Sequence, residues 1–279
     1  MLMRCWGARG SIPVCGPEYL RYGGDTTCLE LRPSADRVIV IDAGTGLRRL
    51  GNRLLDEGVD DVQLLFTHAH WDHLMGFPFF KPLYRPDTSL SVFGCPCAQT
   101  SVREMIAHAM SPPNFPVPLD HTKAALSFTD YCHEPFELDG LTVTPIKISH
   151  PNEGLGYKFT EDGRHFVFLT DNELGHVHPG GRGFDDYVAF CEGADLLVHD
   201  AEFTDQEYQT TRTWGHSTQR DAVDLAIRAG VKALGLFHHN QERGDDAVDA
   251  IVEACRRQIA DCGQSIECFA VAQGTERRV

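Results

Sequence analysis

The heptad Thr67-His68-Ala69-His70-Trp71-Asp72-His73 follows the apolar run Val62-Gln63-Leu64-Leu65-Phe66 and decides the fold. It places three imidazoles and a carboxylate close together, directly where a buried strand is expected to end. Imidazole and carboxylate groups together suit zinc or a similar borderline divalent ion. This spacing lets a turn from strand to helix direct two pairs of ligands at two adjacent ions. The aspartate and the buried-type strand before it favour this interpretation over a solvated histidine-rich loop.

Three later segments also place a candidate ligand at the end of an apolar run. His150 follows residues 141–148, Asp171 follows residues 166–170, and His238 follows residues 234–237. Together with the heptad, and in the same order, these segments resemble the metallo-β-lactamase superfamily. The resemblance covers most of the chain. It implies an α/β fold, a four-layer αβ/βα sandwich with the metals along one edge between two sheets, built as a single domain over residues 1–279.

Further stretches indicate the branch of this superfamily. Residues 7–13 and 21–27 are similar to the glycine-rich opening of the RNase Z group, which also contains cyclic phosphodiesterases. Residues 198–203 and 215–218 resemble the acidic His-Glu-Ala-Thr and His-Ser-Thr elements of the same group. Classical β-lactamases and glyoxalases lack this pair of elements.

The resemblance implies a centre of two divalent metal ions, zinc by preference and manganese as the alternative. One ion would be held by His68, His70 and His150, the other by Asp72, His73 and His238, with Asp171 between them. Adjacent side chains on a strand point to opposite faces, so His238 and His239 cannot both bind the metal directly. The family spacing favours His238, which leaves His239 behind the ligands or in contact with substrate.

Catalytic roles also follow from the resemblance. His216 would donate a proton to the leaving group, and Asp200 would orient it; Asp72 completes the proposed catalytic set. Where this chain has Asp200 the family more often has Glu, so Glu202 stays an alternative partner. Asp42 resembles a buried strand-end aspartate that orients a ligand histidine through its second nitrogen.

The function predicted from these residues is hydrolysis of a small phosphodiester or cyclic nucleotide by a hydroxide that bridges two metal ions. Hydrolysis of a carboxylic ester, lactone or thioester is an alternative, because the same centre serves carbonyl groups. Processing of tRNA 3′ ends is another. A non-hydrolytic protein that binds metal or ligand is the alternative from a different class.

Charge bears on the substrate. The chain has 279 residues, 42% of them hydrophobic, and a net charge of −15. Acidic surfaces repel polyanions, so this charge disfavours nucleic acid as a partner and favours a small molecule. No apolar run approaches the length of a membrane helix, and a homodimer is left open.

Ten cysteines do not by themselves predict disulfides, because the N-terminus does not read as a secretory signal. We expect a reducing, cytoplasmic location. Cys95-Pro96-Cys97 is interpreted as a pair of loop thiols rather than a third metal or redox site, and Cys5, Cys28, Cys191 and Cys268 as small core residues. His176 and His178 precede a Pro-Gly-Gly loop and are expected to be solvated.

Hydrophobic periodicity predicts the secondary structure. Strands are expected at residues 1–6, 27–32, 37–41, 61–66, 89–93, 141–148, 156–160, 165–170, 195–199, 233–237 and 266–271. Helices are expected at residues 46–56, 100–109, 184–191, 218–229 and 245–260. The proline-rich segment from about residue 77 to 135 interrupts this regularity and is interpreted as an insertion that covers the substrate pocket, with a plain surface excursion as the alternative.

Overall fold

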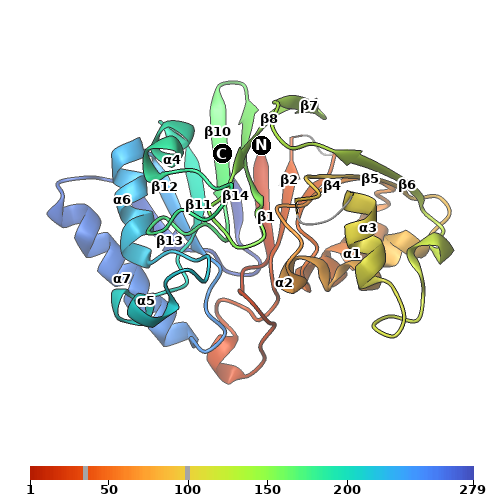
Figure 1. Cartoon of the computed structure of the whole chain (residues 1–279), viewed down its shortest axis with the longest axis horizontal. Coiled ribbons are helices and arrows are strands. Elements are labelled where there is room, and N and C mark those ends of the chain that lie inside the picture. Colours follow the sequence, from red (N-terminus) through yellow and green to blue (C-terminus); the bar gives the residue numbers. More distant parts are fainter. Residues whose placement is uncertain (34–36, 98–100) are drawn as a thin grey trace.

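The computed structural model describes residues 1–33, 37–97 and 101–279, which form two facing seven-stranded sheets with helices outside them (Figure 1). The first sheet has the order β14 (Glu276–Arg278), β1 (Leu2–Gly7), β2 (Cys28–Arg32), β3 (Ile39–Ile41), β4 (Asp61–Leu65), β5 (Ser89–Gly94), β6 (Ala125–Asp130). The second has the order β13 (Glu267–Ala270), β12 (Ala233–Phe237), β11 (Leu196–Asp200), β10 (Arg164–Leu169), β9 (Leu155–Glu161), β8 (Leu141–Lys147), β7 (Phe136–Leu138).

Helices flank the outer face of each sheet. On the first side lie α1 (Gly46–Glu57), α2 (Trp71–Leu74) and α3 (Val102–Ala109); on the second side lie α4 (Phe184–Cys191), α5 (Asp205–Thr211), α6 (Gln219–Ala229) and α7 (Asp245–Asp261). Short 3-10 helices span Pro17–Tyr19, Phe77–Phe79, Lys81–Tyr84 and Leu119–His121. The expected αβ/βα sandwich is therefore confirmed.

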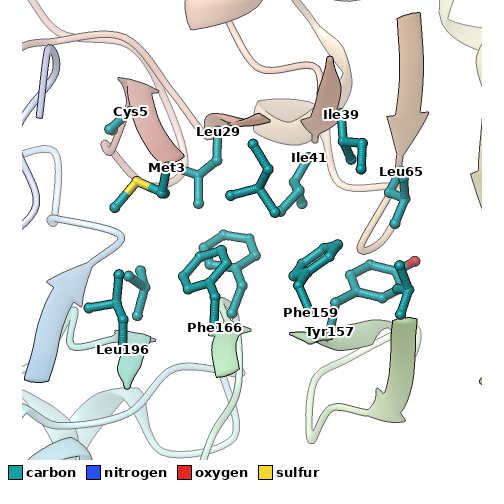
Figure 2. Close-up of a cluster of buried hydrophobic side chains, with 14 of the residues drawn as sticks. Met3, Cys5, Leu29, Ile39, Ile41, Leu65, Tyr157, Phe159, Phe166 and Leu196 are labelled. Carbon is teal, nitrogen blue, oxygen red and sulfur yellow. The ribbon is translucent and has the colours of Figure 1, made fainter. Parts of the chain in front are cut away.

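Strand periodicity explains the layers, because alternate side chains of a strand enter different cores. Along β10, Phe166 packs between the two sheets, whereas Val167 packs beneath the helices of the second side. Figure 2 shows the layer between the sheets, where Leu29 and Ile41 of the first sheet point toward Phe159 and Phe166 of the second. Strands buried on both faces need near-continuous apolar sequence, which is why the apolar runs predicted these strands.

Every strand and helix expected from periodicity is present, with slightly displaced ends; residue 100 of the expected helix at 100–109 lies outside the described residues. Periodicity missed β6, β7, β14, α2 and α5. The described part of the proline-rich segment adds β5 and β6 to the first sheet and also forms α3, and its residues Phe77, Phe80 and Ile106 join the core on that side. Its relation to substrate stays a prediction.

The interpretation of Cys95 as a free loop thiol was wrong. Cys95, directly after β5, forms a disulfide with Cys132, 37 residues farther along, while Cys97 is free. No local pattern predicts this disulfide, because Cys132 reaches Cys95 only through the pairing of β5 with β6. Cys5, Cys28, Cys191 and Cys268 are buried as expected. Within the described ranges, no helix combines the length and apolar character needed to cross a membrane.

Candidate metal centre

The candidate ligands meet because parallel strands end at a common edge. β3 and β4 run parallel in the first sheet, as do β10, β11 and β12 in the second. His68 and His73 follow β4, whereas Asp171 and His238 follow β10 and β12. Their ligand atoms come together where the strands of the two sheets end.

The structure gathers all seven predicted ligands into two clusters that share one residue. Ligand atoms of the first cluster lie within 4.8 Å of one another and belong to His68, His70, His150 and Asp171. Those of the second cluster meet the same limit and belong to Asp72, His73, Asp171 and His238. Asp171 is common to both, as a ligand that bridges two ions would have to be.

Each of these histidines has one ring nitrogen engaged away from the cluster. The outward contacts are His73 Nδ1 to Asp42 Oδ2 (2.8 Å), His150 Nδ1 to the Gly215 carbonyl (2.8 Å), His238 Nδ1 to Glu202 Oε2 (2.9 Å), His68 Nδ1 to Thr67 Oγ1 (3.0 Å) and His70 Nε2 to the Asn152 amide (3.3 Å). Such contacts fix the ring orientation and direct the other nitrogen inward. These contacts thus orient the imidazoles as metal binding requires.

The buried nitrogens test whether the residues fit a metal. Nε2 of His68 and Nε2 of His73 are buried among the described residues and have no hydrogen-bond partner. Unpaired buried polar atoms are costly and need an explanation. His73 Nε2 lies 3.2 Å from Asp171 Oδ1 and 3.3 Å from Asp72 Oδ2, in a mixed imidazole and carboxylate set that suits divalent ions. The donor set therefore fits the expected metals.

Electrostatics at the site divide the imidazoles into two groups. Burial holds the pKa of His150 near 3 and the pKa of His68 well below its usual range, so both are neutral as ligands must be. Burial also opposes the charge of His73, but Asp72 and Asp171 outweigh it and raise the pKa of this imidazole well above its usual range. Metal binding at His73 must therefore displace a proton.

Backbone conformation aims three of the strand-end side chains. Asp42, Asp171 and His238 have φ angles of 62°, 52° and 56°, in the left-handed region that non-glycine residues rarely adopt. Residues in such conformations concentrate at functional sites. Gly10 is required for a different reason: a Cβ atom there would lie 2.2 Å from the His238 ring. The glycine-rich opening thus packs directly against this candidate ligand.

The predicted proton donor lies beside the clusters. His216 Nδ1 is 2.9 Å from Asp200 Oδ2 and 3.5 Å from Glu202 Oε2, so Asp200 is its closer partner and Glu202 instead holds His238. Burial lowers the pKa of His216, but the Glu202 and Asp200 carboxylates outweigh it and raise the pKa to about 9. The shorter Asp200 side chain reaches this imidazole.

Other histidines lie elsewhere. His239 is buried and turned away, with its Nε2 2.9 Å from the Val271 carbonyl, so the structure directs His238 rather than His239 toward Asp171. The expectation that His178 is solvated was wrong. Its Nε2 lies 2.8 Å from Glu173 Oε2 and the side chain is buried, because residues 173–178 fold back over Ser149.

Glu173 is the site residue that sequence reasoning missed. Its buried carboxylate accepts hydrogen bonds from Tyr208 (2.6 Å) and from the backbone of Thr213 (2.7 Å) and Gly215 (2.8 Å), besides the His178 contact. It therefore fixes the loop whose Gly215 carbonyl holds His150. Its only sequence signal is its position two residues after Asp171.

The fold and the two converging clusters define a class, the metallo-hydrolases. Residues 37–239 match the family described as the beta-lactamase superfamily domain. The chain belongs to the metallo-β-lactamase superfamily.

Individual relatives agree with the expected branch. The chain is 29% identical to the ribonuclease Z of Natronomonas pharaonis, over 86% of this chain and 87% of that protein. Among solved structures, the short form of human tRNase Z has a TM-score of 0.68 at 18% identity and covers 100% of this chain and 99% of its own. Unliganded yeast PDE1 has a TM-score of 0.72 at 13% identity, and the match covers 99% of this chain and 98% of that one. The expected resemblance to the RNase Z branch is confirmed.

Proposed function

We propose that this protein is a dinuclear metal-dependent phosphodiesterase that acts on a small phosphodiester. The observation that carries the proposal is the pair of ligand clusters that share Asp171 and direct inward nitrogens at one site. One ion would be held by His68, His70 and His150, the other by Asp72, His73 and His238. Bound divalent ions supply Lewis-acid activation of water and stabilise developing negative charge.

The protein's own residues supply orientation and a proton. Asp42 and Glu202 hold His73 and His238 in the orientations that ligation needs. Burial opposes the charge of His216, but the Glu202 and Asp200 carboxylates raise its pKa, and the protonated imidazole would give a proton to a departing oxygen. A carboxylate that keeps an imidazole charged near neutral pH makes it an acid rather than a base.

Processing of tRNA 3′ ends is the second candidate, favoured by the relatives that carry the name ribonuclease Z. The net charge of −15 supports the small substrate instead, because binding of polyanions depends on basic surface. A titration with precursor tRNA at physiological salt is expected to show no submicromolar binding. Tight, salt-sensitive binding together with 3′ cleavage would favour the RNA substrate and overturn the proposal.

One panel of substrates separates the enzymatic candidates. Zinc- or manganese-loaded protein would be assayed with bis(p-nitrophenyl) phosphate, cyclic nucleotides, p-nitrophenyl acetate and precursor tRNA. We expect turnover of the phosphodiesters to exceed ester hydrolysis. Preference for the acetate would favour a carboxylic ester hydrolase, and metal binding without any turnover would favour a binding protein.

A further inference from the structure

Several large apolar side chains that face solvent lie next in sequence to residues bonded within the candidate metal centre. Among the described residues, six large hydrophobic side chains are more than half exposed: Ile12, Leu20, Trp71, Phe79, Val177 and Trp214. Trp71 lies between two candidate ligands, and Ile12, Val177 and Trp214 each adjoin a residue that is hydrogen-bonded to a candidate ligand or to Glu173, namely Ser11, His178 and Gly215. Singly scattered apolar residues are ordinary on a surface, but exposed apolar residues whose neighbours belong to one hydrogen-bonded site favour a binding role.

The two tryptophans are the largest members of this group. Trp71 lies between the candidate ligands His70 and Asp72 and is 54% exposed. Trp214 is 63% exposed and precedes Gly215, whose carbonyl accepts from His150. His150 in turn lies 2.9 Å from His70. One chain of close contacts therefore connects the backbones that carry the two indoles.

The backbone under each exposed side chain is held by buried polar groups. Glu173 accepts hydrogen bonds from the amides of Thr213 and Gly215, the residues on either side of Trp214. Ser149 Oγ contacts the carbonyl of His176 (2.6 Å) and the amide of His178 (2.9 Å), the residues that flank Val177.

The same arrangement recurs on the first side. The Asp72 carbonyl, next to Trp71, accepts from Thr26 Oγ1 (2.8 Å), and the Asp72 carboxylate accepts from the amide of Ser11 (2.9 Å), next to Ile12. Rigid backbone under an exposed aromatic side chain reduces the entropy lost when a ligand binds.

We propose that Trp71 and Trp214, with Ile12 and Val177 beside them, form an apolar rim that binds a planar aromatic group of the substrate. This inference rests on the proposed function. Indole faces stack on nucleobases and aryl rings without needing charge, and they tolerate differences among such rings. The acidic chain would otherwise repel a polyanion, so recognition of a neutral ring beside a single phosphate is consistent with its charge. Trp71 and Trp214 would thus determine specificity.

Equilibrium binding tests this rim without depending on turnover. Adenosine 5′-monophosphate and ribose 5-phosphate share a sugar and a phosphate and differ by the base. Tryptophan fluorescence would be titrated in metal-loaded Trp6→Phe protein, because the Trp6 indole is bonded to Glu30 (2.8 Å) and would only add background. We expect the adenine compound to bind about tenfold more tightly, the range measured for one stacked base.

Competition with a non-fluorescent readout, such as calorimetry, extends the test to variants that lack both indoles. The preference for adenosine 5′-monophosphate should vanish in Trp71→Ala/Trp214→Ala and persist in Trp71→Phe/Trp214→Phe. Leu20→Ala is the matched control, since Leu20 is 81% exposed but lines a separate surface hollow with Arg4 and Arg49. Circular dichroism would verify that each variant is folded.

The outcomes separate this inference from the proposed function. Equal affinities in the unaltered protein, or a preference that survives loss of both indoles, would overturn the rim. If the tryptophan variants change the oligomeric state but keep the preference for the adenine compound, these side chains belong to a subunit contact. That result would also overturn the proposed rim. Loss of the preference with phosphodiester turnover absent throughout would support the rim and contradict the phosphodiesterase proposal.

Discussion

Asp42 Oδ2 lies 2.8 Å from Nδ1 of His73, and the same carboxylate accepts from the backbone amide (2.8 Å) and the hydroxyl (2.7 Å) of Thr67. Thr67 Oγ1 in turn lies 3.0 Å from Nδ1 of His68. One buried aspartate therefore orients two candidate ligands, one directly and one through a threonine. The sequence predicted that Asp42 orients one ligand histidine, whereas the structure shows a direct contact with His73 and an indirect one with His68.

Asp42→Asn is expected to weaken metal binding by roughly 10- to 100-fold, as loss of a partner behind a ligand usually does. An amide has one accepting oxygen, so it cannot accept all three bonds, and its nitrogen would face either the Thr67 amide or both the Thr67 hydroxyl and His73. Competition with a chromogenic chelator would measure the affinity. Asp61→Asn, at an exposed position on the same sheet, is the matched control. Unchanged affinity in Asp42→Asn would remove this aspartate from the site.

His216→Ala should retain both metals yet reduce turnover by roughly 10²- to 10⁴-fold for a substrate with a poor leaving group. The defect should shrink for p-nitrophenolate, which departs with little help from a proton. Steady-state rates for an alkyl and an aryl phosphodiester would show the contrast. Equal damage to both substrates, or metal loss, would reduce His216 to a supporting role.

Glu173→Gln should destabilise the protein by about 1–3 kcal/mol, because an amide nitrogen would face donors at one end of this buried group. The loop that holds His150 should loosen, so turnover should fall even well below the unfolding temperature. Urea unfolding would measure the stability. Turnover rates would be measured at a temperature about 20–25 °C below the thermal unfolding midpoint, where partial unfolding does not contribute. Glu192→Gln, at an exposed position, should change neither quantity. Activity that survives in the Glu173 variant would make this residue purely structural.

Stability of the metal-free protein should fall as pH rises through about 9. In the folded protein, burial lowers the pKa of His216, but Glu202 and Asp200 outweigh burial and raise this pKa to about 9. In the unfolded chain it is about 6.5. The folded state therefore binds the proton more tightly, and its stabilisation is present below pH ~6.5 and lost through the higher pKa. Urea unfolding would give the free energies of unfolding of the wild-type protein and of His216→Gln below pH ~6.5 and above pH ~9. The difference between the two proteins should be smaller at the higher pH. A difference that grows with pH would contradict the assigned charge.

Much of the site was predictable because its ligands follow strands buried on both faces. Such strands need continuous apolar sequence, so the polar residue that ends each of them is conspicuous, as at Asp171 and His238. Periodicity also located α6 and α7, whose apolar faces pack on one sheet. The resemblance then assigned roles that spacing alone does not provide.

Other features depend on contacts between distant segments. Glu173 and His178 resemble loop residues in sequence, and only the fold of residues 213–215 against them makes the carboxylate buried. The Cys95–Cys132 disulfide depends on the pairing of β5 with β6. The strands β7 and β14 are too short for an alternating pattern and exist through their pairing partners.

Metal content in the Asp171→Ala variant tests the central claim most directly, because Asp171 is the residue shared by both clusters. Elemental analysis of zinc-reconstituted protein should find two ions per wild-type chain, as a two-metal centre requires, and at least one fewer in the variant. Circular dichroism would verify that the variant is folded. Unchanged stoichiometry in a folded Asp171→Ala protein would contradict a shared ligand between two ions.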